Sequence, residues 1–146
     1  MAIAERSAVT TWNGSLAGGS GVIRAADGEL GEIPVTWQSR TAEPGGKTSP
    51  EELAAAAHSS CFAMALALRL GEHKAIPQRL TVSATVTLDE VGGLPTIVSS
   101  DLRVRARVPG LGDASFQAIL DEAAALCPVS RLYAGARISV DGVLET

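Results

Sequence analysis

The sequence predicts an α+β domain with a mainly antiparallel sheet, and three observations support this fold class. One is a long apolar stretch, Ser49 to Gly71, which has the length and the end signals of a single buried helix. Another is the alternation of apolar and polar residues over Leu80 to Glu90, typical of a strand with one buried face. The third is the expected order: three strands, a helix, two strands, a helix and a strand. We expect residues 1–146 to form a single domain, because this length allows a full core.

Three short strands are expected in the N-terminal part. They cover residues 7–12, 21–25 and 33–40. The turn-rich stretch Asn13 to Gly21 is expected to connect the first two strands, since it lacks the Gly-Lys-Ser/Thr of a phosphate loop. Asp27-Gly28 predicts a tight turn before the third strand. A polar loop over Thr41 to Thr48 then leads into the long helix.

The long helix is expected to organise the rest of the chain. Ser49 is a good N-cap, Pro50 suits the first helical position, and Glu52 completes a capping-box pattern. Gly71 is the expected stop. The residues between are apolar nearly all round, so we expect other elements to enclose this helix. Polar residues near its middle and charges at its ends argue against a membrane span.

A hairpin, a second helix and a last strand are expected in the C-terminal part. They cover residues 80–90 and 96–108 for the hairpin, 113–126 for the helix and 136–140 for the strand. Gly92-Gly93 marks the turn of the hairpin, and the arginine row of its second strand is expected to face solvent. Asp113 is the expected N-cap of the helix. The helix should end at Cys127-Pro128, because proline disfavours helix in the residue before it.

Composition excludes some partners and sites. The net charge of −4 and the lack of a dense Lys/Arg run argue against a nucleic-acid partner. The first residues lack the apolar core of a secretory signal, so the cytoplasm is the expected location. The two cysteines and two histidines lack the close spacing of a metal site. Cys61 and Cys127 are therefore expected to be free thiols or a redox couple, since structural disulfides are rare in the cytoplasm.

The residues around Cys61 leave its role open. Small side chains beside it in the helix leave room for a molecule to approach the sulfur, but an inert buried thiol fits the same pattern. His58 lies one helical turn away and could lower the thiol pKa. The favoured interpretation of His58 is a hydrogen-bonded core histidine.

Three segments resemble the osmotically inducible protein C and organic hydroperoxide resistance family (OsmC/Ohr). They are SPEELAAAAHSSCFAMAL, LCPVS around Cys127, and the WQSR before a glycine-rich loop. The spacing from PEEL to the cysteine and the Cys-Pro-Val-Ser motif are together highly specific. The histidine three residues before Cys61, His58, resembles the OsmC branch of the family. This resemblance implies the OsmC-like fold, assembled as an intertwined homodimer with a site at the subunit interface.

The resemblance also implies a thiol peroxidase. Cys61 would be the peroxidatic cysteine, Cys127 the resolving one, and Arg40 and Glu51 the charged part of the site. The expected substrates are organic hydroperoxides and, more weakly, hydrogen peroxide, in oxidative or osmotic stress defence. A dithiol, such as one of lipoyl type, would reduce the Cys61–Cys127 disulfide and restore both cysteines. No metal, flavin or haem is expected as a cofactor.

Physical chemistry explains why such a site needs a cation. The thiolate is the nucleophile, and apolar surroundings in mid-helix raise the pKa of a thiol. A planar guanidinium suits both a thiolate and a peroxide oxygen, and a carboxylate can hold it in place. Residue chemistry alone leaves Arg40, Arg69 and Arg131 as candidates; the resemblance selects Arg40. Without the resemblance, Glu51 would be interpreted as a first-turn partner of the helix dipole.

Two further expectations concern assembly and the rival function. Glu51 and Cys61 are ten residues apart on one expected helix, or about 15 Å at 1.5 Å per residue. If Glu51 orients an arginine beside a cysteine, that cysteine should belong to the partner chain. The rival interpretation is a non-catalytic small-ligand-binding stress protein with the same fold. In that protein both cysteines would be buried structural residues.

Overall fold

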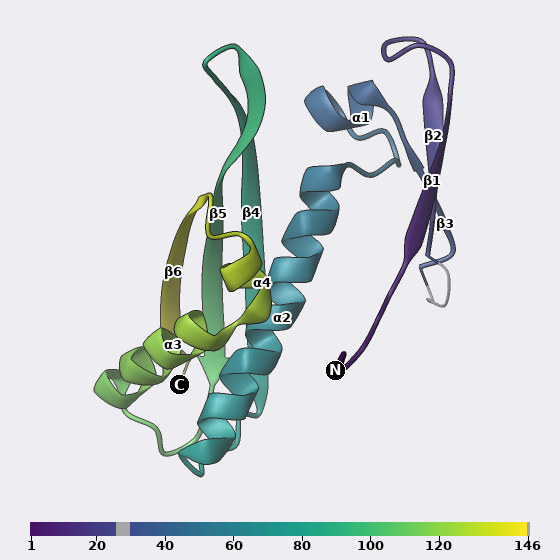
Figure 1. Cartoon of the computed structure of the whole chain (residues 1–146). Coiled ribbons are helices and arrows are strands. Elements are labelled where there is room, and N and C mark those ends of the chain that lie inside the picture. The colour runs from purple at the N-terminus through teal and green to yellow at the C-terminus, as the bar shows by residue number, and fades with distance from the viewer. Residues whose placement is uncertain (26–29, 146) are drawn as a thin grey trace. The chain divides into compact units, whose positions relative to one another are not determined.

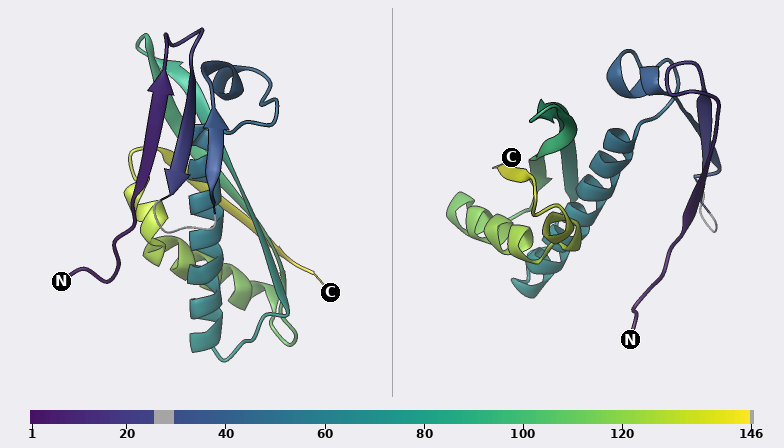
Figure 2. Two further views of the ribbon diagram at one scale, coloured as in Figure 1. Left: turned by 90° about the vertical axis from the view of Figure 1, so that its right-hand side faces the viewer. Right: turned by 45° about the horizontal axis from the view of Figure 1, so that its top comes forward.

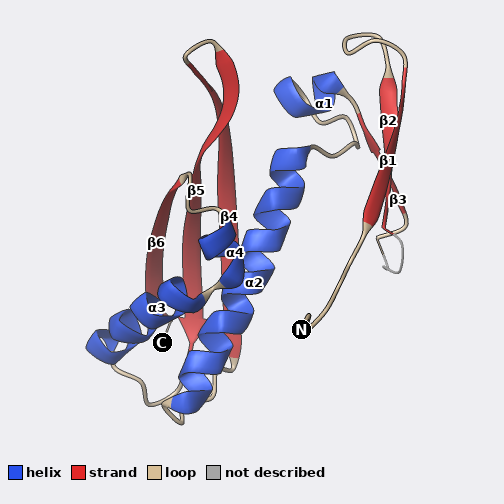
Figure 3. Cartoon of the chain, viewed as in Figure 1, coloured by secondary structure: helices blue, strands red, loops and turns tan. Residues whose placement is uncertain are grey.

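The computed structural model describes residues 1–25 and 30–145, which contain four helices and two three-stranded sheets (Figure 1). The elements, in chain order, are β1 (Ala8–Asn13), β2 (Ser20–Ala25), β3 (Glu32–Val35), α1 (Trp37–Thr41), α2 (Pro50–Glu72), β4 (Arg79–Val91), β5 (Leu94–Arg107), α3 (Asp113–Leu126), α4 (Pro128–Leu132) and β6 (Arg137–Leu144). The predicted α+β class is confirmed (Figure 3). The chain divides into two compact units, Met1–Leu53 and Ala54–Thr146. The single domain stays a prediction.

The first unit is built on an antiparallel sheet of β1, β2 and β3, whose strands run side by side in Figure 2. Trp12 of β1 faces Gly21 of β2 in the register. A Cβ atom added to Gly21 would lie 2.8 Å from Trp12 Cε3, so only glycine lets the indole lie against this strand. The predicted connection between the first two strands is confirmed. The turn predicted at Asp27-Gly28 lies outside the described residues.

The third strand is shorter than predicted, and the interpretation of Ile33 to Arg40 as one strand is wrong. β3 ends at Val35, and α1 begins at Trp37. Thr36 caps this helix: its Oγ1 accepts from the Ser39 N–H at 3.0 Å, and Ser39 Oγ accepts from the Thr36 N–H at 2.9 Å. This reciprocal capping box stabilises a helical turn where alternation of apolar residues predicts a strand.

The long helix is confirmed as α2, although its ends differ in detail. Ser49 Oγ accepts from the Glu52 N–H at 3.1 Å, as an N-cap does. The Glu52 carboxylate accepts from Thr48 Oγ1 at 2.7 Å, in place of the predicted bond back to Ser49. Gly71 lies inside the helix, and the left-handed residue that follows the helix is Lys74 (φ 59°). By length and composition α2 could cross a membrane, a test that core helices of soluble proteins also pass.

The second unit contains a sheet with the order β4-β5-β6 (Figure 1). β4 and β5 form a long antiparallel hairpin around Gly92 and Gly93, both with positive φ. Exposure along β4 alternates as predicted. β6 pairs with β5 in parallel, because the chain crosses over through α3 and α4 before it returns to the sheet. The sheet is therefore mixed, with one antiparallel and one parallel pair.

One hydrophobic core joins α2, α3 and β5 within this unit. Its fully buried large members include Phe62, Leu66, Leu70, Leu102, Val104, Phe116 and Ile119. α3 packs so closely on β6 that a Cβ atom at Gly142 would lie 2.5 Å from Leu120 Cδ1. The opposite side of α2 carries Met64 and Leu68, which are 69% and 54% exposed. Among the described residues of the second unit, the core therefore covers one side of α2, and the enclosure expected all round is not formed within this unit.

The C-terminal elements differ from the prediction in three details. The N-cap of α3 is Gly112, and Asp113 is the first helical residue, where its carboxylate still suits the helix dipole. α3 ends at Leu126 as predicted, but a short helix, α4, follows at once. β6 runs over Arg137–Leu144 and is longer than the predicted 136–140. Side chains of β6 that pack on α3 extend this strand beyond its short apolar pattern.

Candidate functional site

The two cysteines, 66 positions apart in the sequence, meet in the second unit. Cys61 lies in mid-α2, and Cys127 lies at the junction of α3 and α4. Their Sγ atoms are 3.5 Å apart, and both residues are free thiols. Cys127 is fully buried, whereas Cys61 is partly exposed. A disulfide needs about 2.05 Å between the sulfurs, so a small movement would join them.

Local backbone geometry brings the Cys127 sulfur to this position. Cys127 leaves the helical conformation at φ −57° and ψ 117°, and Pro128 starts α4 directly after it. Its carbonyl accepts from the Arg131 N–H at 3.1 Å, the first bond of the new helix. Val129 and Ser130 follow in α4, and their hydrogen-bonding groups lower the pKa of the Cys127 thiol. The sharp change of direction at Cys-Pro therefore decides where the thiol points.

The surroundings affect the acidity of the two thiols in opposite directions. Burial raises the pKa of Cys61, the neighbouring Cys127 raises it further, and a hydrogen bond from the Val129 backbone only partly opposes this. Burial also raises the pKa of Cys127, but hydrogen bonds from the Ser130 hydroxyl and backbone and from Cys61 outweigh burial, and the pKa falls below its ordinary value. The pKa of Cys61 is thus shifted away from the thiolate that the peroxidatic role implied by the resemblance would need.

His58 is a hydrogen-bonded core histidine, as the favoured interpretation predicts. The residue is fully buried. Its Nδ1 lies 2.6 Å from Ser100 Oγ, and its Nε2 lies 2.8 Å from Ser130 Oγ. The Tyr133 ring stands edge-on to the imidazole at a centroid distance of 5.3 Å. Burial lowers the pKa of His58, so the ring is held neutral.

Sequence reasoning missed Ser100 and Ser130 as functional candidates. A signal for Ser100 was present, since it shares a strand face with the buried Leu102 and Val104 and is polar on an apolar face. Ser130 stands in the Cys-Pro-Val-Ser motif, but nothing in the sequence indicates that it faces a histidine 72 positions earlier.

Arg40 and Glu51 form an ion pair in the first unit. Arg40 Nε donates to Glu51 Oε1 at 2.9 Å, and Nη2 donates to the same oxygen at 2.7 Å. The side chains are 29% and 10% exposed, respectively. The guanidinium carbon lies 6.0 Å from the centre of the Trp37 ring. This geometry holds a cation in one orientation, as the resemblance implies for these two residues.

The loop between α1 and α2 brings these two charges together. Ser39 Oγ donates to the Thr48 carbonyl at 2.7 Å, and the Thr48 N–H donates to the Pro34 carbonyl at 3.0 Å. These bonds close the loop against the end of β3 and α1. The last turn of α1, with Arg40, therefore lies beside the first turn of α2, with Glu51.

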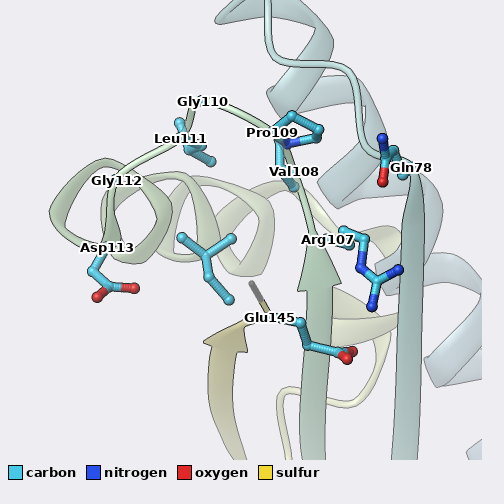
Figure 4. Close-up of a pocket in the computed structure, with 10 residues that line it drawn as sticks. Gln78, Arg107, Val108, Pro109, Gly110, Leu111, Gly112, Asp113 and Glu145 are labelled. Atoms are coloured by element: carbon cyan, nitrogen blue, oxygen red, sulfur yellow. The ribbon is translucent and has the colours of Figure 1, made fainter.

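Two cavities bear on the choice of site. One of about 220 Å³ in the first unit has Arg40 in its wall, among mostly apolar side chains. Those side chains include Trp12, Leu16, Ile23, Val35 and Trp37. A larger cavity of about 490 Å³ lies at the end of β5, where Gln78, Arg107 and Glu145 line it (Figure 4). None of the four predicted site residues lines the larger cavity, so its size does not make it the candidate site.

Metal ligation finds no support in the part of the chain that the structure describes. Within residues 1–25 and 30–145, no group of three or more His, Cys, Asp or Glu side chains is placed to hold a metal ion. The two pairs that the structure does form, Cys61–Cys127 and Arg40–Glu51, are the residues to which the resemblance assigns roles.

Comparisons with known proteins agree on one family. The model of a family described as OsmC-like protein matches residues 43–141. Peroxiredoxin OsmC of Escherichia coli (strain K12) is 36% identical over 135 residues, which cover 92% of this chain and 93% of that protein. The crystal structure of an OsmC-like protein from Mycoplasma pneumoniae superposes with a TM-score of 0.78 at 13% identity, over 99% of this chain and 100% of that one. An organic hydroperoxide resistance protein OsmC from Legionella pneumophila gives 0.74 at 20% identity, over 100% of both chains.

Proposed function

Because this chain belongs to the OsmC-like protein family, we propose that it is a cysteine-based peroxidase that reduces organic hydroperoxides, and hydrogen peroxide more weakly, in stress defence. The observation that carries the proposal is the approach of two free thiols to 3.5 Å from positions 66 residues apart. The name peroxiredoxin, carried by the Escherichia coli relative, supports it. We propose that the protein acts in the cytoplasm.

The proposed reaction uses the two cysteines in turn. The Cys61 thiolate attacks one peroxide oxygen and the O–O bond breaks, so Cys61 becomes a sulfenic acid. The alkoxide takes a proton equivalent to the one that Cys61 lost on ionisation and leaves as the alcohol. Cys127 attacks the sulfenic sulfur, a disulfide forms, and water leaves. An external dithiol, such as one of lipoyl type, then reduces the disulfide by thiol–disulfide exchange. These steps require no metal, flavin or haem.

Arg40 is proposed to supply the positive charge that the Cys61 thiolate needs. Burial raises the pKa of Cys61, so a cation has to offset this effect before the thiolate can form near neutral pH. Glu51 accepts from Nε and Nη2 of Arg40, which leaves both N–H groups of Nη1 and the second N–H of Nη2 to donate to a thiolate or a peroxide oxygen. Glu51 acts as the positioning residue of this pair.

We propose that the complete site is shared between the two chains of a homodimer. Glu51 and Cys61 are ten positions apart on one helix, a separation of about 15 Å along its axis that a glutamate side chain does not bridge. A two-fold dimer could bring the charged pair of one chain to the thiols of the other. The exposed Met64 and Leu68 on α2 support an interface along that helix.

The preference for organic hydroperoxides is proposed from the apolar cavity beside Arg40. Its volume of about 220 Å³ accommodates a small hydrocarbon group, and the indole rings of Trp12 and Trp37 help to line it. A hydroperoxide could place its oxygens toward the guanidinium and its apolar part among these side chains. Hydrogen peroxide has no such part and would gain less from binding.

A peroxide-consumption assay with dithiothreitol tests the function directly. The wild type should consume cumene hydroperoxide faster than hydrogen peroxide, and Cys61→Ser should lose the activity. Ser60→Ala is the matched control, because Ser60 precedes Cys61 and its hydroxyl bonds only to carbonyls of its own helix among the described residues.

The raised pKa of Cys61 also fits the rival, a ligand-binding stress protein with inert thiols. Equally negligible rates in wild type and Cys61→Ser would favour that rival.

A further inference from the structure

A buried chain of hydrogen bonds reaches the Cys127 sulfur through three polar side chains. Ser100 Oγ lies 2.6 Å from His58 Nδ1, and His58 Nε2 lies 2.8 Å from Ser130 Oγ. Ser130 is the third residue after Cys127, which is the N-cap of α4, and the hydroxyl and backbone N–H of Ser130 lower the pKa of the Cys127 thiol. Ser100, His58 and Cys127 are fully buried, and Ser130 is 8% exposed. These groups come from β5, α2 and α4, so a polar path has been assembled inside an otherwise apolar core.

We propose that Ser130 holds the Cys127 sulfur for attack on the oxidised Cys61, and that His58, anchored by Ser100, positions Ser130 for this task. The inference rests on the proposed peroxidase function and assigns its second step to named residues. Ser130 is assigned a catalytic role in this proposal, because its hydroxyl would donate to the reacting sulfur. His58 and Ser100 are positioning residues, because they act through Ser130.

The hydrogen bonds have one consistent direction when Cys127 is a thiolate. The Ser130 hydroxyl donates to the sulfur, His58 Nε2–H donates to Ser130 Oγ, and the Ser100 hydroxyl donates to Nδ1. A neutral imidazole offers one donor and one acceptor nitrogen, so the chain needs His58 in its uncharged form. Burial lowers the pKa of His58 and favours that form. The anion at Cys127 is thus stabilised by oriented dipoles, without a buried cation.

The step that this arrangement serves is formation of the disulfide. The Cys127 sulfur forms a bond with the Cys61 sulfur while the S–O bond of the sulfenic acid breaks. Cys127 is oxidised, and the sulfenic sulfur is reduced. The departing hydroxide combines with a proton equivalent to the one that Cys127 lost on ionisation, which gives water. The 3.5 Å between the sulfurs places the attacking atom close to its target.

The groups that pack against Cys127 in this unit contribute few competing charges. α2 contributes Cys61 and His58, and Tyr133, which directly follows α4, stands edge-on to His58 and has a pKa that burial raises. Tyr133 is neutral at physiological pH, and its hydroxyl donates to the Ala54 carbonyl at 3.1 Å. α3 presents the apolar Ala123 and β5 the uncharged Ser100. A change in the ionisation of Cys127 can therefore be assigned to the chain of hydrogen bonds.

The first test measures Cys127 alone, in a Cys61→Ser background that needs no peroxidase activity. NMR with isotope-labelled cysteine follows the Cys127 Cβ through a pH titration and reports the fold at the same time. Ser130→Ala should move the titration midpoint up by about one pH unit, as expected for the loss of a hydrogen bond to a charged group. Ser130→Thr keeps the hydroxyl and should restore the midpoint. Ser99→Ala is the matched control, since Ser99 is buried to 2% exposure beside Ser100.

The second test follows one turnover in the protein with both cysteines. After one equivalent of cumene hydroperoxide, Ser130→Ala should form the Cys61 sulfenic acid at the wild-type rate and close the disulfide about tenfold more slowly near neutral pH. The difference should shrink at a pH above both Cys127 midpoints. His58→Gln should slow closure of the disulfide in the same way. If His58→Gln does not fold, Ser100→Ala is measured in its place.

The outcomes separate the two proposals. An unchanged midpoint and an unchanged closure rate in a folded Ser130→Ala protein would overturn the role of Ser130 and His58. If no sulfenic acid forms in the wild type, the peroxidase proposal fails, and the inferred role in its second step fails with it. The NMR midpoints would then still report whether the hydrogen bonds stabilise the thiolate, independently of peroxide chemistry.

Discussion

The two units of the chain hold their polar groups in different ways. In Met1–Leu53 the Arg40–Glu51 pair joins residues eleven positions apart, carries full charges and is partly exposed. In Ala54–Thr146 the Cys61–Cys127 pair joins residues 66 positions apart among buried, uncharged groups. A charged group costs less free energy near solvent than in a core. The ion pair therefore lies in a partly exposed environment, and the thiol pair lies among uncharged groups. Burial raises the pKa of Cys61, so this thiol needs a positive charge nearby in order to ionise. The Arg40–Glu51 pair carries such a charge.

The largest expected effect separates the two thiols. Cys127→Ser should keep one rapid oxidation of Cys61 but lose nearly all turnover with dithiol, because the sulfenic acid has no resolving partner. Mass spectrometry after one equivalent of peroxide should find the Cys61–Cys127 disulfide in the wild type and a sulfenic or more oxidised Cys61 in the variant. A wild type that turns over without this disulfide would refute the assigned roles.

The next prediction concerns the charged pair. Arg40→Ala should raise the pKa of Cys61 and slow its alkylation near neutral pH by about tenfold or more, since a nearby opposite charge lowers a pKa by one to three units. The rate of alkylation against pH in a Cys127→Ser background measures this. Arg24→Ala is the matched control, because Arg24 forms a similar pair with Glu32 in the same unit, at 63% and 61% exposure. Identical profiles for the two variants would remove Arg40 from the site.

A smaller signal is expected from subunit exchange. Cys61→Ser and Glu51→Ala proteins should each be nearly inactive, but a mixture under exchanging conditions should recover up to about a quarter of the wild-type activity. About half of the dimers would be mixed, and each would hold one complete site. Native mass spectrometry can confirm that exchange has occurred. Proven exchange without any recovery would mean that each site is built within one chain.

The smallest effect concerns stability and pH. The pKa of His58 is lowered in the folded protein, so the unfolded chain binds more protons below its ordinary pKa of about 6.5. The free energy of unfolding should therefore fall as pH drops from about 7 to about 5, by at most about 1.4 kcal/mol per pH unit for this group. Urea unfolding across this range should show a weaker pH dependence in His58→Gln. Equal slopes in the wild type and in His58→Gln would contradict the assignment.

Local patterns were sufficient for the long elements and insufficient for the short ones. α2, α3 and the β4–β5 hairpin are long enough for periodicity and end signals to agree. α1 and α4 have five residues each, too few for a helical period. The capping pair Thr36 and Ser39 was the available signal for α1, but the apolar alternation before it predicted a strand.

The sequence by itself determined which residues can take part in the chemistry. The two cysteines were expected to be free thiols or a redox couple, and the resemblance named Arg40 and Glu51 as the charged part of the site. Residue chemistry alone left three arginines open. Tertiary structure distinguishes two of them, since Arg40 pairs with Glu51, whereas Arg69 pairs with Glu72 of its own helix.

Only the tertiary structure decided what surrounds the buried sulfur. His58, Ser100 and Ser130 are separated by 42 and 72 positions along the chain, as counted from the histidine. Their hydrogen bonds depend on the packing of α2, β5 and α4 around one core, which no local pattern encodes. A buried imidazole must find partners for both nitrogens, and the fold supplies them from two distant segments. For this reason the sequence predicted a hydrogen-bonded His58 but not which residues would bond to it.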